Sequence, residues 1–575
     1  MLAKNQCFEM TCDAFGQDAQ GVCRHEGMAV FVPGLLPGER ALVRIVKPEK
    51  RYAFGRVEKL LEKSPSRAEP FCPIYKRCGG CVCQHMTYEA SLAFKRQQVQ
   101  DLLQRVGGLS IEVPPVWGMA HPFGYRNKGA YPVAQTDGAP ACGFFAPRSH
   151  DLVPLPENGC AIQGEDSARA TQAILNWMRE NSVPAYDEQT GRGLVRHIMT
   201  RSTTSGELMV VVVVTRADIP KASRLIELLR AAVPGLCSVC LSVNSRRTNV
   251  ILGTDIRVLW GKAAMEDTLC GLRFSVSPLS FFQVNPQQTE RLYGLALEYA
   301  GLTGAETVVD AYCGAGTISL LLAQKAKKVI GIEIVPEAIQ NANENAARNG
   351  IANAEFHVGA TEELLPKLVE NGLRPDVIVL DPPRKGCDPA VLQAIIAAAP
   401  KRVVYVSCGA PTLARDAKLL AEGGYAAEKV QCVDMFCWTG AVETVMCFSK
   451  GTYPHRSVKV EFPLEGLSVA QLQGSATYEQ IKAYVLEHSG LKVSTLYIAQ
   501  VKQKYGIIER ECYNKLKSED AKQPQCPPDK EAAIVEALKF YGLIAPRIFL
   551  IRALFPIHSP DTERHHAKGA GQRLI

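Results

Sequence analysis

The feature that most constrains the fold is a series of apolar runs in the second half of the chain. Each run ends at a glycine or polar residue and is followed by a helical pattern. The runs are Thr307–Asp310, Lys328–Glu333, Pro375–Asp381 and Val403–Val406. Short continuous apolar runs are typical of strands buried on both faces of a parallel sheet. Their alternation with helices predicts a doubly wound α/β domain, which carries its chemistry at the carboxyl ends of the strands.

Two of these strands end in side chains that suggest catalysis. Asp381 is followed by two prolines, which continue neither a ladder nor a helix, so its carboxylate is held at the strand end. Cys408 follows the run that ends at Val406, where the backbone must turn at Gly409. A free cysteine is equally typical of inert core packing, so the interpretation of Cys408 depends on the other motifs.

A glycine turn after the first strand predicts a nucleotide-like ligand. Gly314 and Gly316 allow the backbone to approach that ligand closely. Glu333 ends the next strand roughly twenty residues on, which is the spacing of an acid that binds ribose hydroxyls. The third glycine of G-x-G-x-x-G is absent. Together with the Asp-Pro-Pro strand, this favours S-adenosylmethionine over a dinucleotide.

Five motifs in this order resemble the RNA uracil-5-methyltransferases, over roughly residues 1–450. They are Asp310–Thr317, Gly331–Glu333, Asp381–Arg384, Ser407–Cys408 and Val442–Thr444. The resemblance implies that Cys408 is the nucleophile and that Glu443 is the base, while Asp381 accepts a hydrogen bond from uracil nitrogen 3. It also implies S-adenosylmethionine contacts by Gln283, Tyr312, Gly314, Gly316, Thr317, Glu333 and Asp381.

Three segments depart from the pattern of this family. Relatives usually have proline at 437 and histidine at 440, where this chain has cysteine and glycine. The residues after Cys408, 409–411, also differ from the usual S-C-N-P or S-C-D-P. Ala360 offers no polar side chain near the expected adenine position. Both catalytic side chains remain, so the departures leave open only the geometry of these loops and the adenine contact.

A dense group of cysteines predicts a metal site. Cys72, Cys78, Cys81 and Cys83 lie within twelve residues. Zinc usually takes paired C-x-x-C units, whereas an iron–sulfur cluster takes four thiolates. The spacing leaves the fourth ligand open between Cys83 and a distant residue. Resemblance to the iron–sulfur branch of the family implies a [4Fe-4S] cluster held by Cys72, Cys78, Cys81 and Cys160, with zinc as the alternative.

The N-terminal residues 1–60 alternate short apolar runs with Pro-Gly turns, which predicts a small OB-like β-barrel. The segment resembles the TRAM domain, an RNA-binding barrel. Its basic loop contains Lys47, Lys50, Arg51 and Tyr52, and small barrels bind single strands through such charged and aromatic surfaces. A solvated loop without a ligand is the alternative interpretation.

Length and composition set the remaining limits. A chain of 575 residues is too long for one core. Twenty cysteines without a signal-peptide pattern predict a reducing cytoplasm, and no apolar run has membrane-spanning length. The predicted domains are a barrel (1–60), an iron–sulfur central α+β domain with substrate-facing segments (61–275), a Rossmann-like methyltransferase domain (276–450), a C-terminal helical extension (451–545) and a flexible tail (546–575).

Together these features predict a cytoplasmic, monomeric enzyme that methylates carbon 5 of a uridine in 23S ribosomal RNA. The uridine must be single-stranded or flipped out of its stack. In the family, cluster cysteines favour ribosomal RNA over transfer RNA. The alternatives are a transfer-RNA enzyme, a non-catalytic RNA-binding protein, and an amino-methylating DNA enzyme. Arg384 after Asp-Pro-Pro disfavours the last of these. The sequence does not predict which uridine is modified, or what residues 451–545 do.

Overall fold

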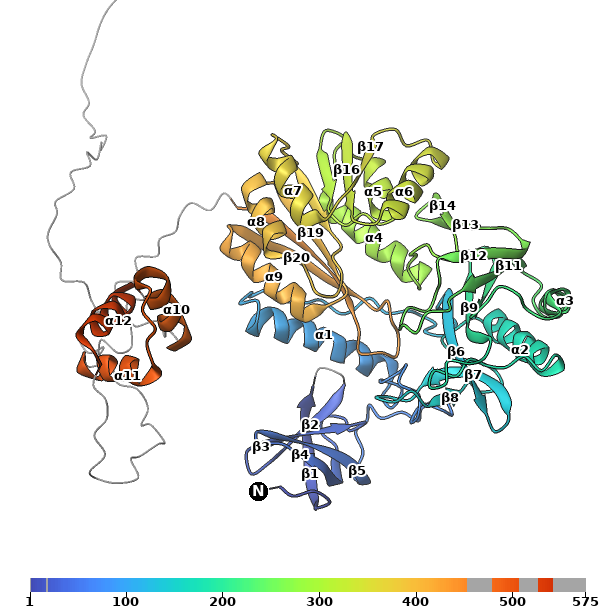
Figure 1. Cartoon of the computed structure of the whole chain (residues 1–575), viewed down its shortest axis with the longest axis horizontal. Coiled ribbons are helices and arrows are strands. Elements are labelled where there is room, and N and C mark those ends of the chain that lie inside the picture. Colours follow the sequence, from blue (N-terminus) through green and yellow to red (C-terminus); the bar gives the residue numbers. More distant parts are fainter. Residues whose placement is uncertain (1, 17–18, 452–477, 506–525, 541–575) are drawn as a thin grey trace, which may run out of the picture. The chain divides into compact units, whose positions relative to one another are not determined.

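The computed structural model describes residues 2–16, 19–451, 478–505 and 526–540. The chain divides into two compact units, residues 1–453 and 454–575 (Figure 1). None of the helices in the described ranges is both long enough and apolar enough to cross a membrane.

The N-terminal strands form a closed barrel in the order β1-β2-β3-β5-β4, drawn in blue in Figure 1. Alternate residues such as Val30, Val43 and Ile45 are fully buried inside it, as the period of a strand requires. The barrel confirms the predicted fold of this segment, with one further strand, β1, that the turn pattern did not indicate. The strands are β1 (Cys7–Phe15), β2 (Gln20–His25), β3 (Met28–Pro33), β4 (Arg40–Pro48) and β5 (Tyr52–Glu62).

The central region is a seven-stranded sheet in the order β12-β11-β10-β9-β6-β7-β8. Every residue of β10 is buried, and helices α2 and α3 contribute to the core of this sheet. A separate hairpin, β13–β14, follows it. The elements are α1 (Tyr88–Arg105), β6 (Lys128–Thr136), β7 (Ala139–Phe145), β8 (Leu152–Pro154), α2 (Glu165–Glu180), β9 (Val195–Ser202), β10 (Leu208–Val214), α3 (Ala222–Ala232), β11 (Leu236–Val243), β12 (Asp255–Gly261), β13 (Met265–Leu269) and β14 (Leu272–Val276).

The apolar runs in the second half of the chain form a second seven-stranded sheet, in the order β17-β16-β15-β18-β19-β21-β20. Its first five strands are parallel, and β21 is antiparallel to both of its neighbours. The elements are α4 (Pro286–Ala300), β15 (Thr307–Asp310), α5 (Thr317–Ala323), β16 (Lys328–Glu333), α6 (Pro336–Arg348), β17 (Ala354–Val358), α7 (Thr361–Glu370), β18 (Val377–Leu380), α8 (Pro389–Ala398), β19 (Arg402–Ser407), α9 (Ala410–Glu422), β20 (Tyr425–Val433) and β21 (Glu443–Lys450).

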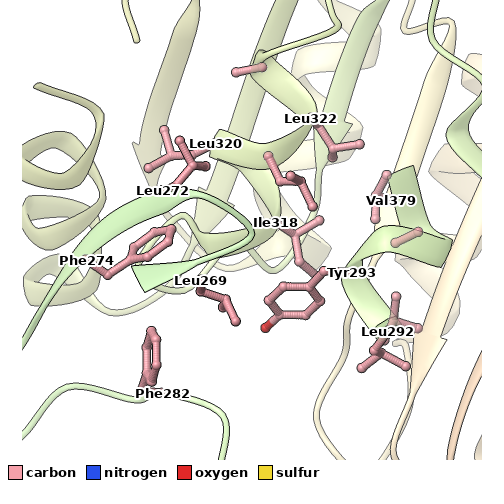
Figure 2. Packing of buried hydrophobic residues seen from close by; sticks show 14 of the residues in the cluster. Leu269, Leu272, Phe274, Phe282, Leu292, Tyr293, Ile318, Leu320, Leu322 and Val379 are labelled. Carbon is pink, nitrogen blue, oxygen red and sulfur yellow. The ribbon is translucent and has the colours of Figure 1, made fainter. Parts of the chain in front are cut away.

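Helices cover both faces of this sheet, which confirms the predicted doubly wound fold. Successive residues of a strand point to opposite faces. Val308 accordingly packs in a core with α4 and α5, and Val309 packs in a core with α8 and α9. Figure 2 shows the first of these cores, with side chains from α4, α5 and the β13–β14 hairpin. The labelled side chains include Leu269, Leu272, Phe274, Leu292, Tyr293, Ile318, Leu320 and Leu322.

The C-terminal unit contains α10 (Tyr478–Ser489), α11 (Thr495–Lys504) and α12 (Pro528–Phe540). These helices enclose a small core of their own that includes Ile481, Val485, Ile498, Val501 and Ile534. The described residues of this unit are therefore mainly helical, as predicted for the extension. The predicted tail, 546–575, lies outside the described residues.

Candidate active site

The thiol of Cys408 and the carboxylate of Glu443 are brought together by strand register. In the antiparallel pair β19–β21, Ser407 lies opposite Thr444, so the next pair along the same register is Cys408 and Glu443. Directly opposite residues have Cα atoms about 4.5–5.5 Å apart. Residues that are distant in sequence thus share one end of the sheet.

Asp381 lies at the same end. It follows β18, whose last residue Leu380 pairs with Tyr405 of β19. The charge of Asp381 influences the ionisation of both Cys408 and Glu443, and so does the charge of Arg384. The structure therefore places all three predicted catalytic residues in one electrostatic environment, with one cation close to them.

The glycine turn has the backbone conformation that its sequence predicts. Gly314 and Gly316 have φ angles of 54° and 82°, in the left-handed region that strongly favours glycine. The Glu333 carboxylate accepts hydrogen bonds from the Gly314 N–H at 3.2 Å and from the Val335 N–H at 3.0 Å. These bonds hold the acid beside the turn.

Gln283 and Thr317 meet through a residue that the sequence did not single out, Tyr293 of α4. The Tyr293 hydroxyl lies 3.3 Å from Thr317 Oγ1, and it also hydrogen-bonds the Gln283 side chain. Its ring is buried in the core shown in Figure 2. The only signal in the sequence was a tyrosine within the apolar stripe of a helix, which is also what ordinary core packing produces.

Tyr312 does not join this group. Its phenol hydrogen-bonds the Cys387 side chain and lies near Asp416, and its ring packs in the core with α8 and α9. The side chain thus points to the opposite face of the sheet from Tyr293. Of Tyr312, only the backbone therefore lies beside Gly314.

The four cysteines predicted to hold a cluster line one cavity of about 380 Å³. These are Cys72, Cys78, Cys81 and Cys160. Cys83 does not line this cavity; its Sγ is buried, 3.5 Å from the carbonyl oxygen of Thr439. As they stand, no three His, Cys, Asp or Glu side chains of the described residues are close enough to hold a metal ion.

Two basic side chains, Arg126 and Lys128, also line the cysteine cavity. Burial and the nearby Arg201 lower the pKa of Lys128 to about 8. Tyr125, in the same segment, is buried and donates a hydrogen bond to the carbonyl oxygen of Cys437 at 3.1 Å. Substrate-facing segments were predicted within residues 61–275, but the side chain of Tyr125 is part of the protein interior.

Comparison with known proteins places this geometry in a family. A methyltransferase-domain model matches residues 302–446, and a TRAM-domain model matches residues 6–57. An uncharacterized RNA methyltransferase of Halalkalibacterium halodurans is 47% identical over 444 residues, which is 77% of this chain and 96% of that protein. One from Clostridium acetobutylicum is 44% identical over 453 residues, 78% of this chain and 98% of that protein. The chain belongs to the RNA methyltransferases.

A solved structure extends the comparison to the fold of a specific enzyme. The tRNA (uracil-54, C5)-methyltransferase of Pyrococcus abyssi in complex with S-adenosyl-L-homocysteine has a TM-score of 0.63 to this RNA methyltransferase. The two are 26% identical, over 77% of this chain and all of the Pyrococcus chain. The solved structure of similar fold thus contains S-adenosyl-L-homocysteine.

The acids of the methyltransferase site hold their protons unusually strongly. Burial and the charge of Asp381 raise the pKa of Glu443 to about 8. Burial and the charge of Asp310 raise the pKa of Asp381 to about 7. Burial, Glu443 and Asp381 together raise the pKa of the Cys408 thiol to about 11, with Arg384 opposing them. The free RNA methyltransferase thus holds a neutral thiol beside acids that titrate close to neutral pH.

A second thiol near the cofactor turn is Cys313. It is buried, and its Sγ lies 2.9 Å from where a Cβ on Gly331 would be. Burial and the charges of Asp310 and Glu333 strongly raise the pKa of this thiol. Cys313 therefore packs against the strand that carries Glu333, and its thiol is less acidic than that of Cys408.

The barrel of the methyltransferase presents aromatic and basic groups on one loop. Tyr52 is 40% exposed, and its ring contacts those of Phe31 and Phe54. Lys47 forms an ion pair of 2.7 Å with Glu49, whereas Lys50 and Arg51 lie next to it in the sequence. This arrangement suits stacking on an unpaired base together with contacts to phosphate.

Proposed function

We propose that this enzyme methylates carbon 5 of a uridine in 23S ribosomal RNA through a covalent bond between Cys408 and the base. The observation that carries the proposal is the register of β19 and β21, which sets Cys408 opposite Glu443, with Asp381 at the end of the next strand. A nucleophile, a base and an acceptor for the uracil edge are the groups that this reaction requires.

The chemistry follows from these three side chains. The Cys408 thiol first loses its proton to solvent. The thiolate then adds to carbon 6 of uracil, and the electron pair of the double bond between carbons 5 and 6 moves toward the carbonyl oxygen on carbon 4. Carbon 5 is now nucleophilic and takes up the methyl group. Glu443 then removes the proton from carbon 5, the double bond re-forms, and the thiolate leaves carbon 6. No net oxidation or reduction occurs.

When bound, S-adenosylmethionine supplies an electrophilic methyl group on a positively charged sulfur, whose charge favours the ionised forms of nearby acids and thiols. Among the chain's own residues, Gln283, Gly314, Gly316 and Glu333 would hold it, with Thr317 supporting Gln283 through Tyr293. The high pKa of Glu443 makes its carboxylate a stronger base than an exposed glutamate.

The choice of ribosomal RNA rests on the four cysteines. The four thiols line one cavity, four thiolates are what a [4Fe-4S] cluster takes, and resemblance to the cluster-containing branch of the family implies ribosomal RNA. Transfer RNA is the second candidate, because the Pyrococcus enzyme of similar fold is named for its action on transfer RNA. Mass mapping of 5-methyluridine in RNA from a deletion strain tests the choice. Loss from 23S ribosomal RNA supports it, and loss from transfer RNA alone would refute it.

We propose that the cluster ligands are Cys72, Cys78, Cys81 and Cys160. These four thiols line the cavity, and Cys83 does not. The role of the cluster is to hold the fold or position RNA, because methyl transfer to uracil consumes no electron. Protein purified without oxygen should be brown and carry about four irons per chain. Stoichiometric zinc without iron would contradict the assignment.

We also propose that the enzyme acts as a monomer in the cytoplasm.

A further inference from the structure

The loop between β20 and β21, residues 434–442, ends directly at the proposed base. Val433 is the last residue of β20 and pairs with Glu443, the first residue of β21. The 434–442 loop thus connects the two strands of a hairpin, and Glu443 is the first residue after the loop. Any displacement of the loop reaches the Glu443 backbone without an intervening strand to absorb it.

Helix α1 holds the start of this loop through a fully buried ion pair. Lys95 Nζ lies 2.5 Å from Asp434 Oδ1 and donates a second bond, of 3.0 Å, to the carbonyl oxygen of Phe436. The Tyr88 hydroxyl donates to Asp434 Oδ2 at 2.7 Å. Buried ion pairs contribute little net stability, but they fix geometry when every group is bonded.

Helix α4 holds the next residues of the loop. Asn285 Nδ2 donates to the carbonyl oxygen of Met435 at 3.1 Å, and Gln288 Nε2 donates to that of Asp434 at 3.2 Å. Asn285 caps the helix that follows Gln283, and Gln288 belongs to its first turn. The loop is therefore tied to the segment that carries a proposed cofactor contact.

Trp438 holds the tip of the loop in a strained conformation. Its φ is 66°, a left-handed value that is costly for a bulky side chain and persists only when the surroundings impose it. The Trp438 carbonyl oxygen accepts hydrogen bonds from the N–H groups of Val82 and Cys83, at 2.9 and 3.0 Å. Its Nε1–H donates to the carbonyl oxygen of Pro122 at 2.8 Å.

The Trp438 ring is also enclosed by aromatic side chains. The rings of Phe71, Tyr88 and Phe123 lie 5.1, 5.2 and 5.8 Å from it, centroid to centroid. Phe71 belongs to the cysteine-rich segment and lines the cysteine cavity. One side chain thus connects this segment, helix α1 and the residues before β6.

We infer that Trp438 is a positioning residue that fixes Glu443 for removal of the proton from carbon 5. The inference rests on the proposed function. A general base must lie within about 2.6–3.2 Å of the proton that it removes. The contacts of Trp438 hold the loop that ends at Glu443, whereas Cys408 directly follows β19. Trp438 should therefore govern the last chemical step and leave the first one, addition of the thiolate, unaffected.

The test compares two RNA substrates with the full-length protein. Trp438→Ala should slow release of methylated uridine RNA by about 10- to 100-fold, since a misplacement of 1 Å can cost on the order of 100-fold. A covalent protein–RNA adduct should then accumulate with ordinary RNA. Adduct formation with 5-fluorouridine RNA should keep its rate, because that reaction stops before proton removal.

Two variants serve as controls. Trp438→Phe keeps an aromatic ring but loses the Nε1 bond to Pro122 and part of the ring contacts, so release should slow by less than in Trp438→Ala, by about two- to tenfold. If Trp438→Ala does not fold, this variant supplies the measurement, and release at the unmutated rate would overturn the inference. Trp260→Phe makes the same substitution on β12, where Trp260 packs against the core of the central sheet, and should leave both rates unchanged.

Two results would overturn the inference, and a third would overturn the proposed function instead. Equal slowing of adduct formation and release in the Trp438 variants would show a general loss of structure. Unchanged release in Trp438→Ala would show that the base is positioned without this residue. Failure of the unmutated enzyme to form any fluorouridine adduct would refute the covalent mechanism itself.

Discussion

Two regions of this protein use cysteine in opposite surroundings. Cys408 is a single thiol at a strand end, and the charges nearest to it are the acids Glu443 and Asp381, opposed by Arg384. Cys81 shares a cavity with three other thiols and with the basic side chains of Arg126 and Lys128. Burial raises the pKa of Cys81 to about 12, and the neighbouring cysteines add to that rise.

In the proposed function this difference fits two separate tasks. The lone thiol of Cys408 would add to uracil and leave again, with the Glu443 carboxylate beside it as the proposed base. Four grouped thiols repel one another when ionised, so a cationic centre is needed to hold them as thiolates. Arg126 acts in the same direction, because its charge opposes the rise in the pKa of Cys160. Substitutions in the two regions should therefore have different effects.

The largest effect is expected for Cys408→Ala. Methylation should fall by at least about a thousandfold, because the nucleophile is lost. Binding of S-adenosylmethionine, measured by calorimetry, should persist, since Gly314, Gly316 and Glu333 are untouched. Cys313→Ala is the matched control, a thiol beside the cofactor turn that should be replaceable with a modest loss. A fully active Cys408→Ala enzyme would show that Cys408 is not the nucleophile.

Glu443→Gln should reduce turnover by roughly 10²–10⁴-fold, the usual contribution of a general base. Addition and methyl transfer should still occur, so a covalent adduct with ordinary RNA should accumulate and be visible by intact-mass spectrometry. A variant that loses turnover without any adduct would show that Glu443 acts before methyl transfer.

The pH dependence follows from the raised pKa of Glu443. A base acts only when ionised, and burial moves its pKa to about 8 in the free enzyme. The Cys408 thiol, with a pKa of about 11, must also be ionised. The value of kcat/KM should therefore rise by about a hundredfold per pH unit below pH 8, where both groups must lose a proton, and by about tenfold per unit from pH 8 to pH 11. A rate that is constant between pH 6 and pH 8 would contradict this environment.

Substitution of a cysteine that lines the cavity should lower the bound iron more than it lowers the rate of methylation. Cys160→Ser should lower the iron bound by anaerobically purified protein and destabilise the fold, measured as the thermal midpoint. Methylation should fall by less than about tenfold, because no cluster electron enters the reaction. Cys83→Ser is the matched control and should retain iron. Loss of iron in Cys83→Ser alone would move the fourth ligand to that residue.

The smallest effect is expected on the barrel. Replacing Lys50 and Arg51 by alanine should weaken RNA binding several-fold and flatten its salt dependence. The logarithmic slope should decrease by about 0.7 for each phosphate that the loop no longer neutralises. The choice of uridine should not change. An unaltered slope would show that this basic loop does not bind RNA.

Much of the fold could be predicted because it depends on local patterns. The apolar runs became β15, β16, β18 and β19, and the strand ends at Glu333 and Asp381 were predicted within one residue. The side-chain group around Tyr293 could not be predicted, since its partners Gln283 and Thr317 come from separate elements. The bonds at Trp438 depend on packing between distant segments, and its left-handed backbone has no signal in the sequence.

Strand register explains why the sequence could not predict how the residues of the site are arranged. That Cys408 and Glu443 belong to one site came from resemblance, whereas their adjacency comes from β21 running antiparallel beside β19. The side chain of Tyr312 shows the converse case. The motif placed it at the cofactor turn, but packing directs its phenol to the other face of the sheet. A motif identifies a position in the chain, and only packing sets the direction of the side chain.

The most direct test of the central claim is the reaction of the unmutated enzyme with 5-fluorouridine RNA and S-adenosylmethionine. In 5-fluorouridine a fluorine replaces the hydrogen on carbon 5. No base can remove this fluorine as it removes a proton, so the covalent adduct should be trapped. Intact-mass spectrometry should show the protein joined to RNA, and peptide mapping should place the bond on the peptide that contains Cys408. An adduct on another cysteine, or none at all, would contradict the assignment of Cys408 as the nucleophile.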